Sequence, residues 1–236
     1  MAGGLDGYLR HPRHGPLPAL LIVLTVATGL VDAVSILGLG RVFVANMTGN
    51  VVFIGFGLAG AEGYSISGSL VALVGFLVGA SAGGVLVHRI PEHRGRLLRD
   101  ATAVELVLLV GALLVAVAGP PRPGLLGQLV IVALAAVGLG VQNAVVRRLA
   151  VPDLTTTVLT MTLTGIGSDL RRRDLPTLVR RLIAVAAMLV GAAVGAVLVL
   201  NAGLGWGLAA VVAVLAVVLV VAALGSRMPA DWHRGS

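Results

Sequence analysis

The chain has 236 residues, of which 58% are hydrophobic and 11% are charged, whereas soluble domains carry about 25% charged residues. All 17 basic residues are arginines and the formal net charge is +7. They lie between apolar runs and not along one face, which argues against nucleic acid as a partner. Without cysteine the chain has neither disulfides nor thiolate sites. This composition predicts an all-α polytopic membrane protein that is surrounded by the lipid bilayer.

Six apolar runs are close to the twenty or so residues that a helix needs to cross a hydrocarbon layer of roughly 30 Å. The first run follows Arg10 and Arg13, as the apolar part of a signal peptide would. It is too long for a signal peptide and lacks a small-residue cleavage pattern. We therefore expect six spanning helices, at about 18–38, 66–88, 101–119, 124–146, 180–200 and 204–225.

Two further segments, 42–59 and 154–168, are shorter or more polar than an ordinary span. The first contains the polar stretch NMTGN, which begins at Asn46, and the second carries six threonines between Thr155 and Thr164. Irregular backbone at membrane depth must be shielded by protein or line a cavity, because unpaired polar groups are costly in hydrocarbon. We expect both segments to be re-entrant or broken helices.

The arginines test this topology, because cytoplasmic loops carry an excess of positive charge. If both polar segments return to the face that they left, every arginine except Arg41 and Arg122 falls on the side of the N-terminus. If both crossed completely, the arginines of 89–100 would face away from Arg10 and Arg13. The first arrangement is favoured, and it predicts that both termini are cytoplasmic.

Three spans and one re-entrant segment per half make the second half start from the opposite face, which predicts an inverted 3+3 repeat. The first repeat covers 18–122 and the second 123–225, between an N-terminal tail of 1–17 and a C-terminal tail of 226–236.

The sequence carries traces of this repeat. GLVDA, which begins at Gly29, is similar to GVQNA, which begins at Gly140, at an offset of 111, and Thr48 precedes Thr160 by 112. Single matches between the halves arise easily by chance in a chain with 33 glycines. Chance similarity is therefore the alternative to a true repeat. A ladder of small residues recurs at the same offset and predicts close helix packing; its members are Gly75, Gly79, Gly83, Ala187, Gly191 and Gly195.

Asp32 is the strongest single candidate for a residue that binds a solute or an ion. It lies fourteen residues after Pro18, which is about 21 Å along a helix, and acids at membrane depth usually serve ion or solute pathways. The alternative is an interfacial acid that pairs with Arg41. We expect Asp32 to lie in a solute- or ion-binding site formed where the two re-entrant segments meet. The candidate residues are Asp32, Asn46, Thr48, Gly49, Asn50, Gln142, Asn143, Thr157, Thr160 and Thr162.

Other polar residues have simpler explanations. Glu105 opens the third predicted span, where an acid at a helix start is favourable, and the arginines of 171–173 are expected to be a topology signal that touches lipid headgroups. The five histidines fall in predicted loops and tails without ligand spacing, so we expect no metal site. No nucleophile–base pair or phosphate loop is found, so we expect neither an enzyme nor a cofactor.

Two pairs of motifs give the chain a family resemblance. GLVDAVSILGLG followed by VANMTGN, and later GVQNA followed by TTTVLTMT, resemble the YoaK-like family of bacterial membrane proteins over about residues 18–225. The resemblance implies a multi-pass protein of the bacterial inner membrane and little chemistry, since the family is a domain of unknown function. Members often have Thr-Gly at the level of Thr160, where this chain has Met161.

These features together favour a secondary transporter of a small polar solute, coupled to a proton or another cation through Asp32. Six spans with two half-helices also suit an aquaporin-like passive channel, although paired Asn-Pro-Ala motifs are lacking. A non-transporting scaffold that docks partners on its arginine-rich loops is the third possibility. The substrate, the coupling ion and the oligomeric state are left open by the sequence.

Overall fold

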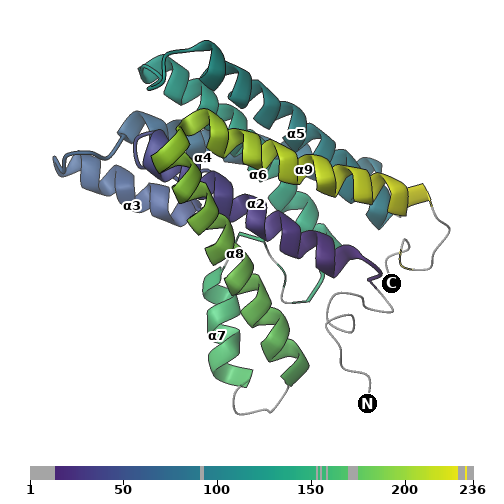
Figure 1. The fold of residues 1–236 in the computed structure, drawn as a ribbon. Helices are drawn as coiled ribbons and strands as arrows, with labels where there is room; N and C mark the ends of the chain where they lie inside the picture. The colour runs from purple at the N-terminus through teal and green to yellow at the C-terminus, as the bar shows by residue number, and fades with distance from the viewer. Residues whose placement is uncertain are drawn as a thin grey trace.

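The computed structural model describes residues 14–90, 93–152, 154, 156–157, 159–169, 175–227 and 232, and the regular elements within them are helices (Figure 1). Six are long and apolar enough to cross a membrane. These are α2 (Leu17–Gly38), α4 (Ile66–Arg89), α5 (Arg94–Ala118), α6 (Leu125–Leu149), α8 (Leu175–Ala202) and α9 (Leu204–Arg227). They match the six predicted runs, and the all-α polytopic class is confirmed.

Two shorter helices interrupt this series where the polar segments were predicted. They are α3 (Met47–Leu58), which packs on α4, and α7 (Leu159–Asp169), which packs on the first part of α8 (Figure 1). At 12 and 11 residues they are about 18 and 16 Å long, too short to cross a bilayer. Several residues named above lie outside the described part, namely Arg10, Arg13, Thr155, Arg171, Arg172 and Arg173.

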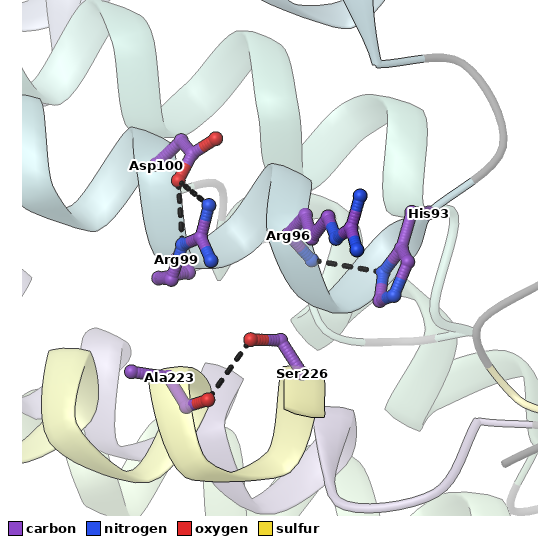
Figure 2. A network of polar contacts seen from close by, with 6 residues as sticks. All are labelled: His93, Arg96, Arg99, Asp100, Ala223 and Ser226. Atoms are coloured by element: carbon purple, nitrogen blue, oxygen red, sulfur yellow. Dashed lines mark hydrogen bonds and ion pairs between the residues drawn. The ribbon is translucent and has the colours of Figure 1, made fainter. Parts of the chain in front are cut away.

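The start of α5 corrects one prediction. The helix begins at Arg94 and not near residue 101, because the ring of His93 accepts a hydrogen bond from the backbone N–H of Arg96 at 3.1 Å and caps the first turn (Figure 2). The polar turns that follow include the ion pair of Arg99 with Asp100 at 2.6 Å. Glu105 therefore lies in the interior of the helix, and its interpretation as a helix-start acid was wrong.

Helices α2 and α6 form the centre of the bundle. Some 72% of the most apolar stretch of α2 and 61% of that of α6 are buried, against 22% to 33% for the other four long helices. Each central helix packs most extensively on a helix of the other half of the chain, α2 on α8 and α6 on α4. The outer helices leave apolar side chains exposed, as expected of a surface that faces lipid.

The α2–α8 contact depends on small residues. A side chain on Gly191 would collide with the backbone of Val26, and one on Gly195 would meet Leu30. Contacting residue numbers rise together along both helices, so α2 and α8 run in the same direction.

The α4–α6 contact has the same form. A side chain on Gly79 would collide with the backbone of Val137, and one on Gly83 would meet Val141. Each of these four residues lies 111 or 112 positions from its counterpart in the α2–α8 contact, and α4 and α6 also run in the same direction. The predicted packing ladder thus lies at both contacts between the halves.

Other contacts complete the set of helix directions. A side chain on Gly138 of α6 would touch Leu109 of α5, whereas one on Gly111 of α5 would touch Leu134 of α6, so these two helices are antiparallel. Helix α9 is antiparallel to α2, because Leu204 lies at Gly38 and Val34 lies at Gly207. The start of α5 lies beside the end of α9 near Ser226 (Figure 2). Helices α2, α5 and α8 therefore run one way, and α4, α6 and α9 the other.

These directions place both connecting segments. The end of α2 and the start of α4 lie at one end of the bundle, so the chain of 39–65 leaves and returns there. The end of α6 and the start of α8 lie at the other end, so 150–174 returns to that end. Arg94, at the start of α5, also lies at this second end of the bundle. Its Nη1 contacts Nδ1 of His14 at 2.9 Å, and its guanidinium donates a hydrogen bond to the carbonyl oxygen of Leu149.

Candidate functional site

The first connecting segment turns back from α2 into the bundle. Gly40 and Arg41 have φ angles of 84° and 58°, a left-handed conformation that reverses the chain. The buried amide of Asn50 in α3 then holds the backbone of Phe43: its Oδ1 accepts from the N–H at 2.9 Å and its Nδ2 donates to the carbonyl at 2.7 Å. The Asn50 amide thus pairs with both backbone groups of Phe43, as a neighbouring β-strand would. Gly49 leaves room for the ring of Phe43.

Asp32 faces this segment from α2. Its side chain is 6% exposed, and its Oδ1 accepts a hydrogen bond from the backbone N–H of Ala45 at 3.4 Å. Arg41 instead stacks on Tyr64, with its guanidinium carbon 5.8 Å from the ring centroid. Among the described residues no ion pair involves Asp32, so the alternative of an Asp32–Arg41 pair is contradicted.

The second connecting segment is held by α6 through side chains. Nδ2 of Asn143 donates to Oγ1 of Thr157 at 2.6 Å. The neighbouring Gln142 contacts Oγ1 of Thr156 at 3.1 Å. Thr156 is buried and has a φ of 51°, which is a strained angle for a β-branched residue. Strain of this kind persists where surrounding contacts enforce it, and Gln142 supplies one such contact.

Glu105 is a polar residue of this region that the sequence did not reveal. It is 1% exposed, and when the amide of Gln142 is oriented to satisfy all its neighbours, its nitrogen donates to both carboxylate oxygens at 2.8 and 2.9 Å while its oxygen accepts from Thr156. The chain Glu105–Gln142–Thr156 links α5 to the second segment. The apolar residues on either side of Glu105 could have indicated that this side chain is buried. The prediction of a helix start near residue 101 led instead to its interpretation as a helix-start acid.

The two short helices begin at a shared cavity of about 670 Å³. Its walls come from both connecting segments, from the first parts of α3 and α7, and from single residues of α2, α4, α6 and α8. Seven of the ten predicted site residues line it: Asp32, Asn46, Thr48, Gly49, Asn143, Thr157 and Thr160. The structure thus brings together residues from both halves that are far apart in the sequence.

Three predicted site residues do not line the cavity. Asn50 is fully buried against Phe43, Gln142 points to Glu105 and Thr156, and Thr162 is buried with 6% exposure. Asn50 and Gln142 therefore hold the segments that form the wall of the cavity and do not line it themselves.

Apolar residues that the sequence did not single out complete the lining. Phe76 on α4 and Met188 on α8 lie 112 residues apart and occupy corresponding places, since a side chain on Gly140 would meet Phe76 and one on Gly29 would meet Met188. The remaining apolar lining residues are Phe43, Ala45, Met47, Val52, Phe53 and Leu159. In a chain this apolar, such residues cannot be distinguished from lipid-facing ones by type.

The cavity has opposite electrostatic poles. Asp32 is the one ionisable side chain among the described residues that line it. The first turn of α3 supplies the opposite pole, because the first backbone N–H groups of a helix lack intrahelical partners and carry partial positive charge. Asn46, the N-cap of α3, makes no capping hydrogen bond through its side chain, and Met47, Thr48 and Gly49 of this first turn line the cavity. Across the described residues no group of three or more potential metal-ligating side chains gathers.

Comparison with known proteins agrees with this picture. The family described as "Protein of unknown function (DUF1275)" matches residues 20–222, which run from α2 to α9. The chain belongs to this family. The UPF0700 transmembrane protein YoaK of Bacillus subtilis (strain 168) is 29% identical to this chain over 154 residues, or 65% of this chain and 67% of the relative. No solved structure matches. The predicted YoaK-like resemblance is confirmed, and the protein is a multi-pass membrane protein.

Proposed function

We propose that this protein is a secondary transporter of a small polar solute, which binds in the cavity between α3 and α7. The observation that carries the proposal is the meeting of two short helices, one from each half, at a cavity with polar groups from both halves. Broken helices whose ends face a central site are the usual way in which transporters bind solutes within the bilayer. Asp32 is the cation-binding group of the cavity, so a proton or another cation occupies it during transport.

An inverted repeat is part of the proposal. It is supported by the equivalent contacts of Gly79 with Val137 and of Gly191 with Val26, and by the opposite ends at which the two connecting segments return. In such proteins one unit rocks against the other around a fixed site. We expect this rocking movement at the close glycine contacts between α2 and α8 and between α4 and α6.

The orientation in the membrane follows from the arginines. Arg89, Arg94, Arg147 and Arg148 lie at the end of the bundle that carries the start of α2, whereas Arg41 lies at the other end. We therefore propose, by the positive-inside rule, that both termini face the cytoplasm of a bacterial cell and that α3 and α7 enter from opposite faces.

Single cysteines test this orientation, because the natural chain contains none. Glu62→Cys and Asn201→Cys should react with an impermeant maleimide added to intact cells, whereas Arg96→Cys and Arg148→Cys should react only after permeabilisation. Labelling of Arg96→Cys and Asn201→Cys from the same side would overturn the inverted arrangement.

Transport itself is tested with purified protein in liposomes that contain a pH-sensitive dye. Candidate solutes are added outside, and a coupled transporter gives saturable uptake with a change of internal pH. Asp32→Asn should abolish coupled uptake, while Glu62→Gln, which removes an exposed carboxylate that does not line the cavity, should leave it unchanged. Uptake that is unaffected by Asp32→Asn rules out the proposed role of this residue.

The other outcomes separate the alternatives. Flux that rises linearly with solute concentration, without saturation, indicates a passive channel. No flux for any solute, with a second protein that co-purifies in fixed proportion, indicates a scaffold. Either result would replace the transporter as the function of the cavity.

A further inference from the structure

We infer that the solute is a small zwitterion of the α-amino acid type, whose ammonium group binds Asp32 and whose carboxylate binds the uncapped start of α3. The inference rests on the proposed function and specifies the solute class. It also specifies the cation that occupies Asp32, which is then part of the solute.

The ammonium site is built by α2. The carboxylate of Asp32 is more than nine-tenths buried, lines the cavity and has no cationic partner among the described residues. Its hydrogen bond from the N–H of Ala45, at 3.4 Å, leaves acceptor capacity, because an ionised carboxylate has about four lone-pair positions. A buried charge without a partner is costly, and an ammonium group from the ligand relieves that cost.

The carboxylate site is built by the first turn of α3. The backbone N–H groups of Met47, Thr48 and Gly49 are the first three of the helix, and all three residues line the cavity. The hydroxyl of Thr48 and the amide of Asn46 add donors that are exposed to the cavity. Helix starts with free N–H groups bind carboxylates well, and the start of α7 at Leu159 and Thr160 faces the same space.

The separation of the two sites suits one small molecule. Ala45 and Met47 are two residues apart, so the backbone nitrogen of Met47 lies within roughly 10 Å of the Asp32 carboxylate. A small α-amino acid that makes a hydrogen bond of about 2.9 Å at each end covers separations of up to about 9 Å, so one such molecule can reach both groups. The cavity of about 670 Å³ leaves space for a side chain toward Phe76 and Met188.

Solutes with a single charge fit less well. An anion at the start of α3 would lie close to the negative charge of Asp32, and a cation at Asp32 would leave the N–H groups of α3 without an acceptor. A neutral polyol would leave the charge of Asp32 unpaired. The zwitterion satisfies both poles at once.

The experiment measures ligand-dependent thermal stabilisation of the purified full-length protein in detergent. The twenty L-amino acids are tested first, since a ligand that binds only the folded state raises the Tm. The best amino acid is then compared with two fragments of itself, the amine that lacks the carboxylate and the acid that lacks the ammonium group. We expect each fragment to bind at least tenfold more weakly.

Two variants test the two poles separately. Asp32→Asn should abolish stabilisation by the amino acid. Met47→Pro removes one N–H at the first position of α3, where proline is tolerated. The conformation of Asn46 (φ −106°, ψ 86°) lies outside the α region that a following proline disfavours. It should weaken amino-acid binding about tenfold. Ile66→Pro, at the first position of α4 and outside the cavity, is the matched control and should leave binding unchanged.

The inference is overturned if no amino acid raises the Tm, if either fragment binds as tightly as the whole amino acid, or if Asp32→Asn retains full affinity. The fragment comparison uses the natural chain, so it decides the question even if a variant does not fold. Saturable uptake of a non-zwitterionic solute in the liposome assay would leave the proposed function standing while this inference fails. Absence of all uptake would remove both.

Discussion

The two connecting segments perform the same task with different chemistry. In the first, side chains bind backbone: Asn50 holds both polar groups of Phe43 and Asp32 accepts from Ala45. In the second, side chains bind side chains, since Asn143 holds Thr157 and Gln142 contacts Thr156. The segment of the first half is therefore held mainly through its backbone, whereas the described part of the second segment is held through its threonine side chains.

The two halves also differ in buried carboxylates, because both Asp32 and Glu105 belong to the first half. Asp32 lines the cavity, and its counterpart in the second half is the neutral Asn143. Glu105 binds Gln142 and does not line the cavity. The cavity thus receives one acidic side chain from its described lining, which makes it electrostatically asymmetric.

The largest expected effect comes from the clamp of the first segment. Asn50→Leu leaves the N–H and the carbonyl of Phe43 without their partner in a partly buried site, and each unpaired group costs about 1–3 kcal/mol. We expect the free energy of unfolding to fall by about 2–5 kcal/mol, measured by chemical or thermal unfolding in detergent. Asn46→Ala removes an amide of the same segment that is exposed to the cavity and should change stability little. Equal losses in the two variants would contradict the clamp.

The glycine contacts test how far the two halves are equivalent. Gly79→Ala and Gly191→Ala each drive a methyl group into backbone across the interface, so we expect both to lose about 1–3 kcal/mol of stability. Gly84→Ala, on the same helix as Gly79 but with open space around it, is the control and should be neutral. A large loss at one of the two positions and none at the other would show that the interfaces are not equivalent.

The buried chain Glu105–Gln142–Thr156, which joins the two halves, should show energetic coupling. A double-mutant cycle of Glu105→Ala and Gln142→Ala is expected to give a coupling energy of about 1–2 kcal/mol in the unfolding free energy, because the two side chains share a buried hydrogen bond. The same cycle with Glu105→Ala and Thr160→Ala should be additive, because Glu105 bonds to Gln142 whereas Thr160 accepts a hydrogen bond from Thr164. Additivity of the first cycle would show that Gln142 does not bind Glu105.

The smallest effect concerns the turns that begin the two segments. Gly40 and Ala150 both have positive φ angles, of 84° and 47°, but only the first is glycine. A non-glycine residue in this conformation costs about 1 kcal/mol, so Ala150→Gly should raise the stability and Gly40→Ala should lower it, each by about 1 kcal/mol. Shifts of the same sign in the two variants would show that backbone strain does not govern these turns.

The long helices could be predicted from the sequence because each is an uninterrupted apolar run. Their ends could not be predicted as well, since the capped polar turn at His93 carries no apolar signal and Glu105 was misinterpreted as a result. The directions of the helices could be predicted from the arginines and the 112-residue offset of small residues such as Gly79 and Gly191, because both patterns record the topology.

The candidate cavity could be predicted in part. Asp32, Thr48 and Asn143 are conspicuous because polar residues are rare in this chain, and they do line it. The same rule failed for Asn50, since rarity does not tell whether an amide faces a ligand or holds the backbone. The contribution of Phe76 depends on the crossing of α4 with α6, which the sequence does not specify.

Each central helix packs on a helix of the other half, and this has a consequence for how the protein is synthesised and folded. Helix α2 finds its main neighbour in α8, which the ribosome produces about 150 residues later, and α4 must wait for α6. When the first half leaves the ribosome, the small-residue face of α4 has not yet been covered by α6 and is exposed to lipid. The first half alone therefore lacks its main packing partners. Each half is the scaffold on which the other is completed.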